Sequence, residues 1–109
     1  MREMTLREIC DSVDVSRRAV QGYEKAGLVS ASGKNERGYL LYNVGAQERI
    51  RRIKFFQQLG FTIKEIKNMI DAPNDVLKDA LVNRVENLKE EKVHVECLIS
   101  KAYELIEKL

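Results

Sequence analysis

The sequence predicts a mostly α-helical protein, in which short helices and a small β-hairpin precede one long C-terminal helix. Two segments, Thr5-Leu6-Arg7-Glu8 and Thr62-Ile63-Lys64-Glu65, have the form of capping boxes that open helices. Residues 39–42 (YLLY) are short, aromatic and typical of a strand. After Pro73, the only proline, apolar residues recur with the period of a coiled coil, and no glycine interrupts them.

Two short helices are predicted at the start of the chain. Thr5 opens a helix that runs to about Ser12, and Ser16 caps a second helix over residues 17–25, which Gly27 ends. A turn of about four residues joins the two helices, which is typical of a helix-turn-helix. The second helix is expected to bury Ala19, Val20 and Tyr23.

A β-hairpin, hereafter the wing, and two further helices follow. Gly33 and Gly38 bracket the polar tip of the wing. Asn43 caps a third helix that ends at Gly60, and Thr62 opens a fourth. The residues expected to face inward from these two helices are Val44, Ile50, Ile53, Phe55, Phe56, Ile63, Ile66 and Ile70.

The last helix is predicted from about Asn74 to Leu109, about 35 residues or roughly 52 Å. One series of positions in this helix, hereafter the seam, is spaced by four and three residues in alternation. All of its residues are apolar except Lys92. A helix of this length cannot bury such a seam against a 70-residue head alone, so we expect a homodimer. The predicted dimerisation residues are Leu81, Val85, Leu88, Val95, Ile99, Ala102, Ile106 and Leu109.

Composition and charge favour a cytoplasmic protein that meets a polyanion through its first part. No apolar run approaches the roughly 18 residues of a membrane span, and the N-terminus lacks a signal-peptide core. Residues 1–71 contain 13 Lys or Arg and 9 Asp or Glu, net +4, whereas residues 72–109 contain 6 and 8, net −2. We expect a head at residues 1–72, a dimerisation helix at residues 73–109 and no separate effector domain.

Arg17 and Arg18 are the clearest functional signal. They lie in the first turn of the second helix, where the helix dipole disfavours cations. A helix-turn-helix presents this turn to base edges in the major groove of DNA, where arginine can bind guanine or phosphate through two parallel hydrogen bonds. The alternative is that these arginines are ordinary solvated charges, because 33% of the chain is charged.

Other polar residues join this DNA-binding hypothesis. Gln21 can reach an adenine edge or a phosphate, and the Tyr23 hydroxyl can reach a phosphate while its ring packs inward. Thr62 and Lys64 lie at a helix start, where free N–H groups attract phosphate. The predicted DNA-binding residues are Ser16, Arg17, Arg18, Gln21, Tyr23, Lys34, Arg37, Tyr39, Thr62 and Lys64. Arg49, Arg51, Arg52 and Lys54 are interpreted as a solvated helix face, with one or two of them contacting the DNA backbone.

The sequence resembles the MerR family of bacterial transcription regulators. The matching segments are MTLREIC, VSRRAVQGYEKAGLV, RGYLLY and RIKFFQQLGFTIKEIKNMI, in the family's order and spacing. The resemblance implies a winged helix-turn-helix head and an antiparallel coiled coil between two protomers. It also implies a sequence-specific regulator that binds a palindromic promoter operator, distorts that DNA and has RNA polymerase as a further partner.

Four positions depart from the family pattern, one of them Asp14 in the turn after the first helix, where the family often has glycine. The family usually has Arg and an aromatic residue before Tyr-Glu, where this chain has Gln21 and Gly22, and it usually has Arg where this chain has Leu40. Two cations are therefore replaced, which bears on operator sequence and affinity.

No enzymatic, metal or cofactor site is predicted. The chain has no nucleophile–base pair or phosphate-binding loop, and His94 has no partners at metal-ligand spacing. Two alternatives stay open. One is a protein-interaction module that pairs through its coiled coil and binds DNA weakly, and the other is a thiol, redox or metal sensor that uses Cys97. Independently of these alternatives, Cys10 is expected to be a core thiol.

Overall fold

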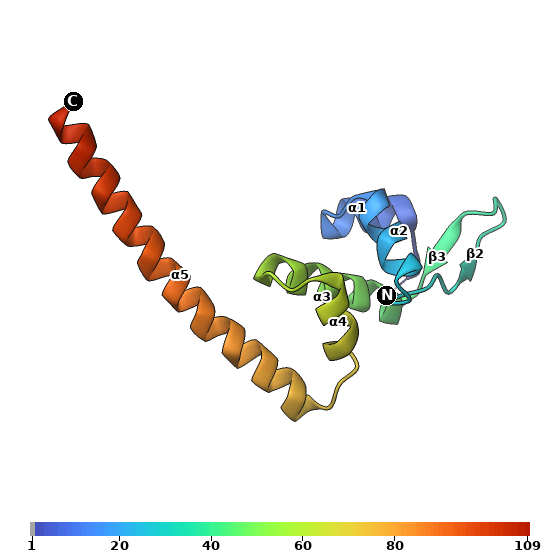
Figure 1. Cartoon of the computed structure of the whole chain (residues 1–109). Coiled ribbons are helices and arrows are strands. Elements are labelled where there is room, and N and C mark those ends of the chain that lie inside the picture. Colours follow the sequence, from blue (N-terminus) through green and yellow to red (C-terminus); the bar gives the residue numbers. More distant parts are fainter. Residues whose placement is uncertain (1) are drawn as a thin grey trace. The chain divides into compact units, whose positions relative to one another are not determined.

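The computed structural model describes residues 2–109, which form two compact units (Figure 1). The first unit, the head, ends at Asp71, and the second comprises Ala72–Leu109. The elements are mostly helices, with one small sheet in the head and one long C-terminal helix, which confirms the predicted fold class. Among the described residues, no helix is both long and apolar enough to cross a membrane.

The helix-turn-helix has the predicted bounds, because its polar caps have the predicted partners. Helix α1 (Leu6–Val13) opens with a complete capping box, in which Thr5 Oγ1 accepts from the Glu8 N–H at 3.3 Å and Glu8 Oε1 accepts from the Thr5 N–H at 3.0 Å. Asp14 ends α1 in the left-handed conformation, with φ of 56°. Helix α2 (Arg17–Lys25) begins where Ser16 Oγ accepts from the Ala19 N–H at 3.0 Å.

The wing belongs to a three-stranded antiparallel sheet with strand order β1-β3-β2. Strands β2 (Gly33–Lys34) and β3 (Leu40–Tyr42) form the predicted hairpin. Strand β1 (Met4–Thr5), which pairs with β3, was not predicted, since two residues show no alternation of apolar and polar side chains. The buried Gln47 amide donates to the carbonyls of Tyr42 at 2.8 Å and Arg2 at 2.9 Å. It thereby attaches β3 and the segment before β1 to the third helix.

Helices α3 (Val44–Leu59) and α4 (Ile63–Met69) cover the rest of the head core. Each has its predicted cap, Asn43 for α3 and the capping box of Thr62 for α4. The fully buried side chains come from α1, α2, β3, α3, α4 and the segment after α2, and include Ile9, Val20, Leu28, Tyr42, Ile50, Ile53 and Ile66.

One inward-facing residue was predicted wrongly. Phe56 is buried, but the neighbouring Phe55 is 52% exposed, because successive residues of a helix point about 100° apart. Among the other expected core residues, Ala19, Val44 and Ile63 are only half-buried.

The second unit is helix α5 (Asn74–Lys108), a single helix of 35 residues. No residue along α5 is buried. Several seam positions are half exposed or more, including Val95 at 51%, Ile99 at 50% and Ile106 at 60%. The helix therefore presents an apolar face that has no cover within the described chain.

Gly22→Ala is expected to stabilise the head. Gly22 is an exposed residue within α2, and a Cβ added there would meet no heavy atom within 4 Å. Alanine should raise the free energy of unfolding by about 0.5–1 kcal/mol, because it suits a helix and restricts the unfolded chain. Urea unfolding measures this change. Gly27→Ala is the control and should destabilise, since Gly27 has a φ of 77°; an unchanged or lower stability for Gly22→Ala would contradict the prediction.

Candidate nucleic-acid interface

The first turn of α2 exposes two arginines. Arg17 and Arg18 directly follow the Ser16 cap, and both side chains are exposed. No acidic residue lies in this turn to balance them. Because the dipole at a helix N-terminus disfavours positive side chains, this arrangement has a local energetic cost.

The tip of the wing is held by one side chain, Asn35. Its Oδ1 accepts from the backbone N–H of Arg37 at 2.9 Å and of Tyr39 at 3.0 Å. Gly38 completes the turn with a φ of 81°. The turn presents Arg37 and Tyr39 outward, and Tyr39 is 58% exposed.

Three segments of the head surround one groove, hereafter the arginine groove, with a volume of about 690 Å³. It lies among the start of α1, the start of α2 and the wing. The residues that line it are Thr5, Leu6, Arg7, Arg17, Asn35, Arg37, Gly38, Tyr39 and Leu40. The structure thus brings Arg17, Arg37 and Tyr39, three of the predicted DNA-binding residues, to the same groove.

Cations of the head divide into two groups. On α3, Arg51 pairs with Glu48 at 2.9 Å, and Lys54 approaches Asp14 at 4.0 Å. Within the part of the chain that the structure describes, Arg7, Arg17 and Arg37 form no ion pair. The positive charge around the arginine groove is therefore available to an external anion, whereas most of that on α3 is matched internally.

The remaining predicted DNA-binding residues lie outside this groove. Arg18, Gln21, Lys34 and Lys64 have exposed side chains. The hydroxyl oxygen of Thr62 accepts from the Glu65 N–H at 3.2 Å, and the Thr62 N–H donates to Glu65 Oε1 at 2.9 Å.

Tyr23 differs from these exposed residues. Its side chain is 2% exposed, and its hydroxyl donates to Gln57 Oε1 at 2.6 Å. Burial also raises the pKa of the Tyr23 hydroxyl. A phosphate contact would require this hydroxyl to leave Gln57, so the geometry favours a packing role for Tyr23.

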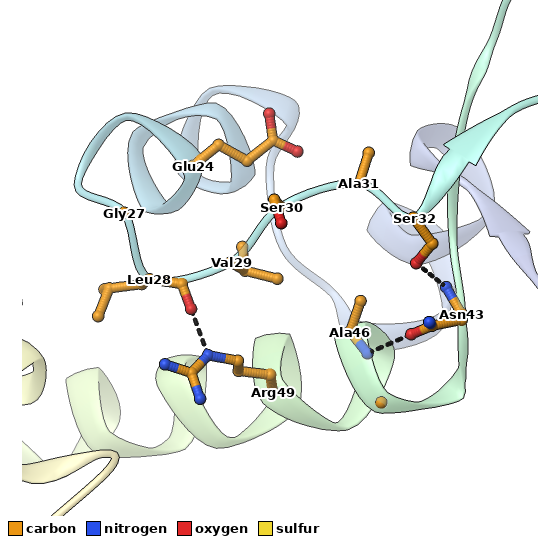
Figure 2. A pocket seen from close by; sticks show the side chains of 11 residues that line it. Glu24, Gly27, Leu28, Val29, Ser30, Ala31, Ser32, Asn43, Ala46 and Arg49 are labelled. Carbon is orange, nitrogen blue, oxygen red and sulfur yellow. Dashed lines mark hydrogen bonds between the residues drawn. The ribbon is translucent and has the colours of Figure 1, made fainter.

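A second, more open groove of about 630 Å³ lies where residues 28–32 connect α2 to the wing (Figure 2). Arg49 Nε donates to the Leu28 carbonyl, and Ser32 Oγ accepts from the Asn43 N–H at 2.9 Å. Two further Arg49 nitrogens donate to the Asp71 carboxylate, each at 2.7 Å. These bonds hold the connection against α3, so this groove is read as structural support for the wing.

Asp71→Asn is expected to lower the Tm of the head at neutral pH but not in acid. Hydrogen bonds from Arg49 hold the pKa of Asp71 below its ordinary value of 3.8. A carboxyl whose folded pKa is depressed stabilises the folded state above its unfolded pKa, and this contribution is lost as the pH falls through the folded pKa. The Tm difference between the two proteins should therefore be present at pH 7 and shrink below about pH 4.

Thermal unfolding between pH 3 and pH 7 measures this difference. The effect should be modest, since the Asp71 side chain is 70% exposed and solvent screens the pair. Glu36→Gln, which removes an exposed carboxylate of the wing, serves as the matched control. A Tm difference as large at pH 3 as at pH 7 would show that Asp71 acts through packing instead of its charge.

Sequence reasoning missed Arg7, Asn35 and the role of Arg49. Arg49 acts through partners that only the fold brings near, such as the Leu28 carbonyl, whereas Asn35 acts locally on N–H groups two and four residues further along the chain. Arg7 did carry a signal, because it is a cation in the first turn of α1, as Arg17 and Arg18 are in α2. Within residues 2–109, no group of three His, Cys, Asp or Glu side chains could hold a metal ion. Cys10 is half-buried and Cys97 is exposed.

A helix-turn-helix followed by a wing defines the head as a winged helix-turn-helix, a class of DNA-binding domain. The family model described as "MerR HTH family regulatory protein" matches residues 4–73. The chain therefore belongs to the MerR family of DNA-binding transcription regulators, which confirms the resemblance seen in its motifs.

Individual relatives support this assignment. The HTH-type transcriptional activator mta of Bacillus subtilis is 33% identical over 94 residues, which cover 86% of this chain and 37% of that protein. The crystal structure of a MerR family transcriptional regulator from Bacillus cereus has a TM-score of 0.80 and 27% identity, covering 98% of this chain and 82% of that one. The chain thus spans little more than a third of the length of mta.

A further structure shares the fold. HiNmlR, a MerR family regulator lacking the sensor domain and solved bound to promoter DNA, has a TM-score of 0.76 and 16% identity. The match covers 91% of this chain and 80% of that one. The relatives described here are transcription regulators and not enzymes.

Proposed function

We propose that this protein binds a palindromic promoter operator as a homodimer and regulates transcription by distorting that DNA. The observation that carries the proposal is the set of unpaired arginines on the head. Arg17 and Arg37 line one groove, Arg18 lies beside Arg17, and none of the three has an ion-pair partner in the described chain. A phosphate backbone offers the charge that they lack.

The proposed roles follow from position. Arg18, together with Gln21 one turn further along α2, reads base edges in the major groove, since both side chains are exposed. Arg17 contacts a base edge or the adjacent phosphate. Lys34, Arg37 and Tyr39 contact the flanking backbone from the wing, while Lys64 and Ser16 contact phosphates at the starts of α4 and α2.

Dimerisation through α5 supports the palindrome. The uncovered seam of α5 needs an apolar partner, and a second copy of the same helix supplies one with the same spacing. The family resemblance favours an antiparallel pair. A two-fold dimer presents two equivalent heads, which match the two halves of an inverted repeat.

Distortion of the operator is carried over from the family. Bending a site of about 20–30 base pairs costs about 1–6 kcal/mol by smooth elastic estimates, and the contacts of two heads offset this cost. Distortion of the promoter DNA changes how RNA polymerase engages the two sequence elements of the promoter. RNA polymerase is therefore the further partner that we propose.

Selection from a pool of randomised duplexes tests the proposal. The purified full chain should enrich sequences that share an inverted repeat, with half-sites separated by about one or two helical turns. Energy transfer between dyes at the two ends of an enriched duplex should then increase on binding, as it does for bent DNA. Enrichment of single half-sites would argue against the dimer, and no enrichment would argue against sequence-specific binding.

The same pool tests the alternative of a protein-interaction module. Such a module would bind all duplexes weakly and equally while remaining dimeric through α5. The unpaired arginines of the head weigh against this alternative. A cation at a helix start is locally unfavourable, and a module that binds DNA only weakly gains little to offset that cost.

A further inference from the structure

Arg7 has a place in the arginine groove that its position in the chain does not suggest. It lies in the first turn of α1, ten residues before Arg17 and thirty before Arg37, yet all three line the same groove of about 690 Å³. No acidic residue is among the residues that line it. Three arginines therefore line the arginine groove, and no acidic residue lines it with them.

The carboxylate next to Arg7 in the sequence, that of Glu8, is already engaged. Glu8, which follows Arg7, accepts from the Thr5 N–H at 3.0 Å and forms an ion pair with Arg2. These bonds lower the pKa of Glu8 to about 2, with the Arg2 hydrogen bond as the largest cause. Glu8 is thus committed to the capping box and to Arg2, and Arg7 has no ion-pair partner within residues 2–109.

The position of Arg7 is also unfavourable for its own helix. It is the second residue of α1, where the positive end of the dipole disfavours a cation. The same conflict holds for Arg17 and Arg18 at the start of α2. An arginine is thus unfavourably placed in the helix dipole at the starts of both α1 and α2. Because two of these three arginines also line one groove, the arrangement points to a negatively charged ligand.

We propose that the arginine groove holds the sugar-phosphate backbone of one DNA strand, and that Arg7 contacts a phosphate there. In a helix-turn-helix the first helix crosses the backbone, so a cation at the start of α1 is suited to phosphate and not to a base edge. Arg7 thereby supplies a cation in a head where Gln21 and Leu40 replace two that the family usually has. This inference rests on the proposed DNA-binding function and adds a residue to it.

The test uses the full chain with Arg7→Gln and Arg7→Lys. Fluorescence anisotropy gives affinities for an enriched duplex and for a scrambled one, at several salt concentrations. Lys101→Gln, which removes one exposed charge from α5, is the control. Thermal unfolding is measured in parallel, because Arg7→Gln should leave the Tm equal or slightly higher.

Arg7→Gln should weaken binding to both duplexes by about eightfold at 0.1 M salt, because one phosphate contact contributes about 0.9 to the salt slope. For Arg7→Gln, the slope of log affinity against log salt concentration should fall by that amount, and the ratio of the affinities for the two duplexes should not change. Arg7→Lys should keep the slope of the unchanged protein. Lys101→Gln should behave as the unchanged protein does.

Two results would overturn the role of Arg7. An unchanged slope for Arg7→Gln would show that it contacts no phosphate, and a lower ratio between duplexes would show that it reads a base. The proposed function is tested separately by the unchanged protein, through the ratio of its affinities for the enriched and the scrambled duplex. If the unchanged protein shows no sequence preference but Arg7→Gln still lowers the salt slope, the phosphate contact stands and the proposed operator is rejected. If the protein binds no DNA at all, both proposals are rejected.

Discussion

Replacing Ile99 by aspartate is expected to make the protein monomeric and to abolish its preference for an operator. Ile99 lies in the middle of the α5 seam, is 50% exposed in the single chain and would be buried against the partner helix. A carboxylate there must be desolvated without a partner, which strongly destabilises the pair. Loss of the second head should weaken specific binding by about 100- to 10,000-fold, since binding of the two heads is no longer linked.

Sedimentation velocity and anisotropy on an enriched duplex measure the two effects. Ser100→Asp is the matched control, because it adds the same carboxylate one residue along, on the outward side of the seam. The head should stay folded in both variants, since Ile99 belongs to the second compact unit. A dimer that persists with Ile99→Asp would refute the proposed seam.

Arg18→Ala is expected to relax base discrimination. If Arg18 forms two hydrogen bonds to a guanine edge, its loss costs about 1–3 kcal/mol on the operator, or roughly 5- to 150-fold. Binding to a scrambled duplex should change much less. The fold should not be weakened, because Arg18 is an exposed cation at the disfavoured end of α2.

Lys64→Ala provides the contrast. A phosphate contact by Lys64 carries no sequence information, so its loss should weaken all duplexes alike and lower the salt slope by about one unit. Anisotropy titrations of both variants against operator and scrambled duplexes separate the two roles. Equal losses on both duplexes for Arg18→Ala would assign it to the backbone and leave base reading to other residues.

The sequence predicted the helices well because their ends depend on local chemistry. The capping boxes at Thr5 and Thr62 and the caps at Ser16 and Asn43 involve residues only three positions apart, so they can be read directly from the chain. The fold class follows from these starts, from the hairpin and from the uninterrupted seam of α5.

Contacts between distant segments could not be predicted in this way. Strand β1 exists because it pairs with β3, some 37 residues away in sequence, and Arg49 contacts Leu28 and Asp71, which are 21 and 22 residues away. The 3.6-residue helical period also left Phe55 and Phe56 hard to separate, and only packing resolves which one is buried.

The candidate site shows the same division. Residue type and helix position singled out Arg17 and Arg18, since a cation at a helix start is locally unfavourable. The groove itself depends on how α1, α2 and the wing come together, so the proximity of Arg7 to Arg37 could not be read from the sequence.

Fluorescence anisotropy on the duplex upstream of the protein's own gene tests the central claim most directly. The titration is run beside a scrambled duplex at several salt concentrations. The account predicts a large preference for the native duplex and an affinity that falls steeply with salt, because several arginines and lysines release counterions from phosphate. Equal and weak binding to both duplexes, with a shallow salt dependence, would contradict it.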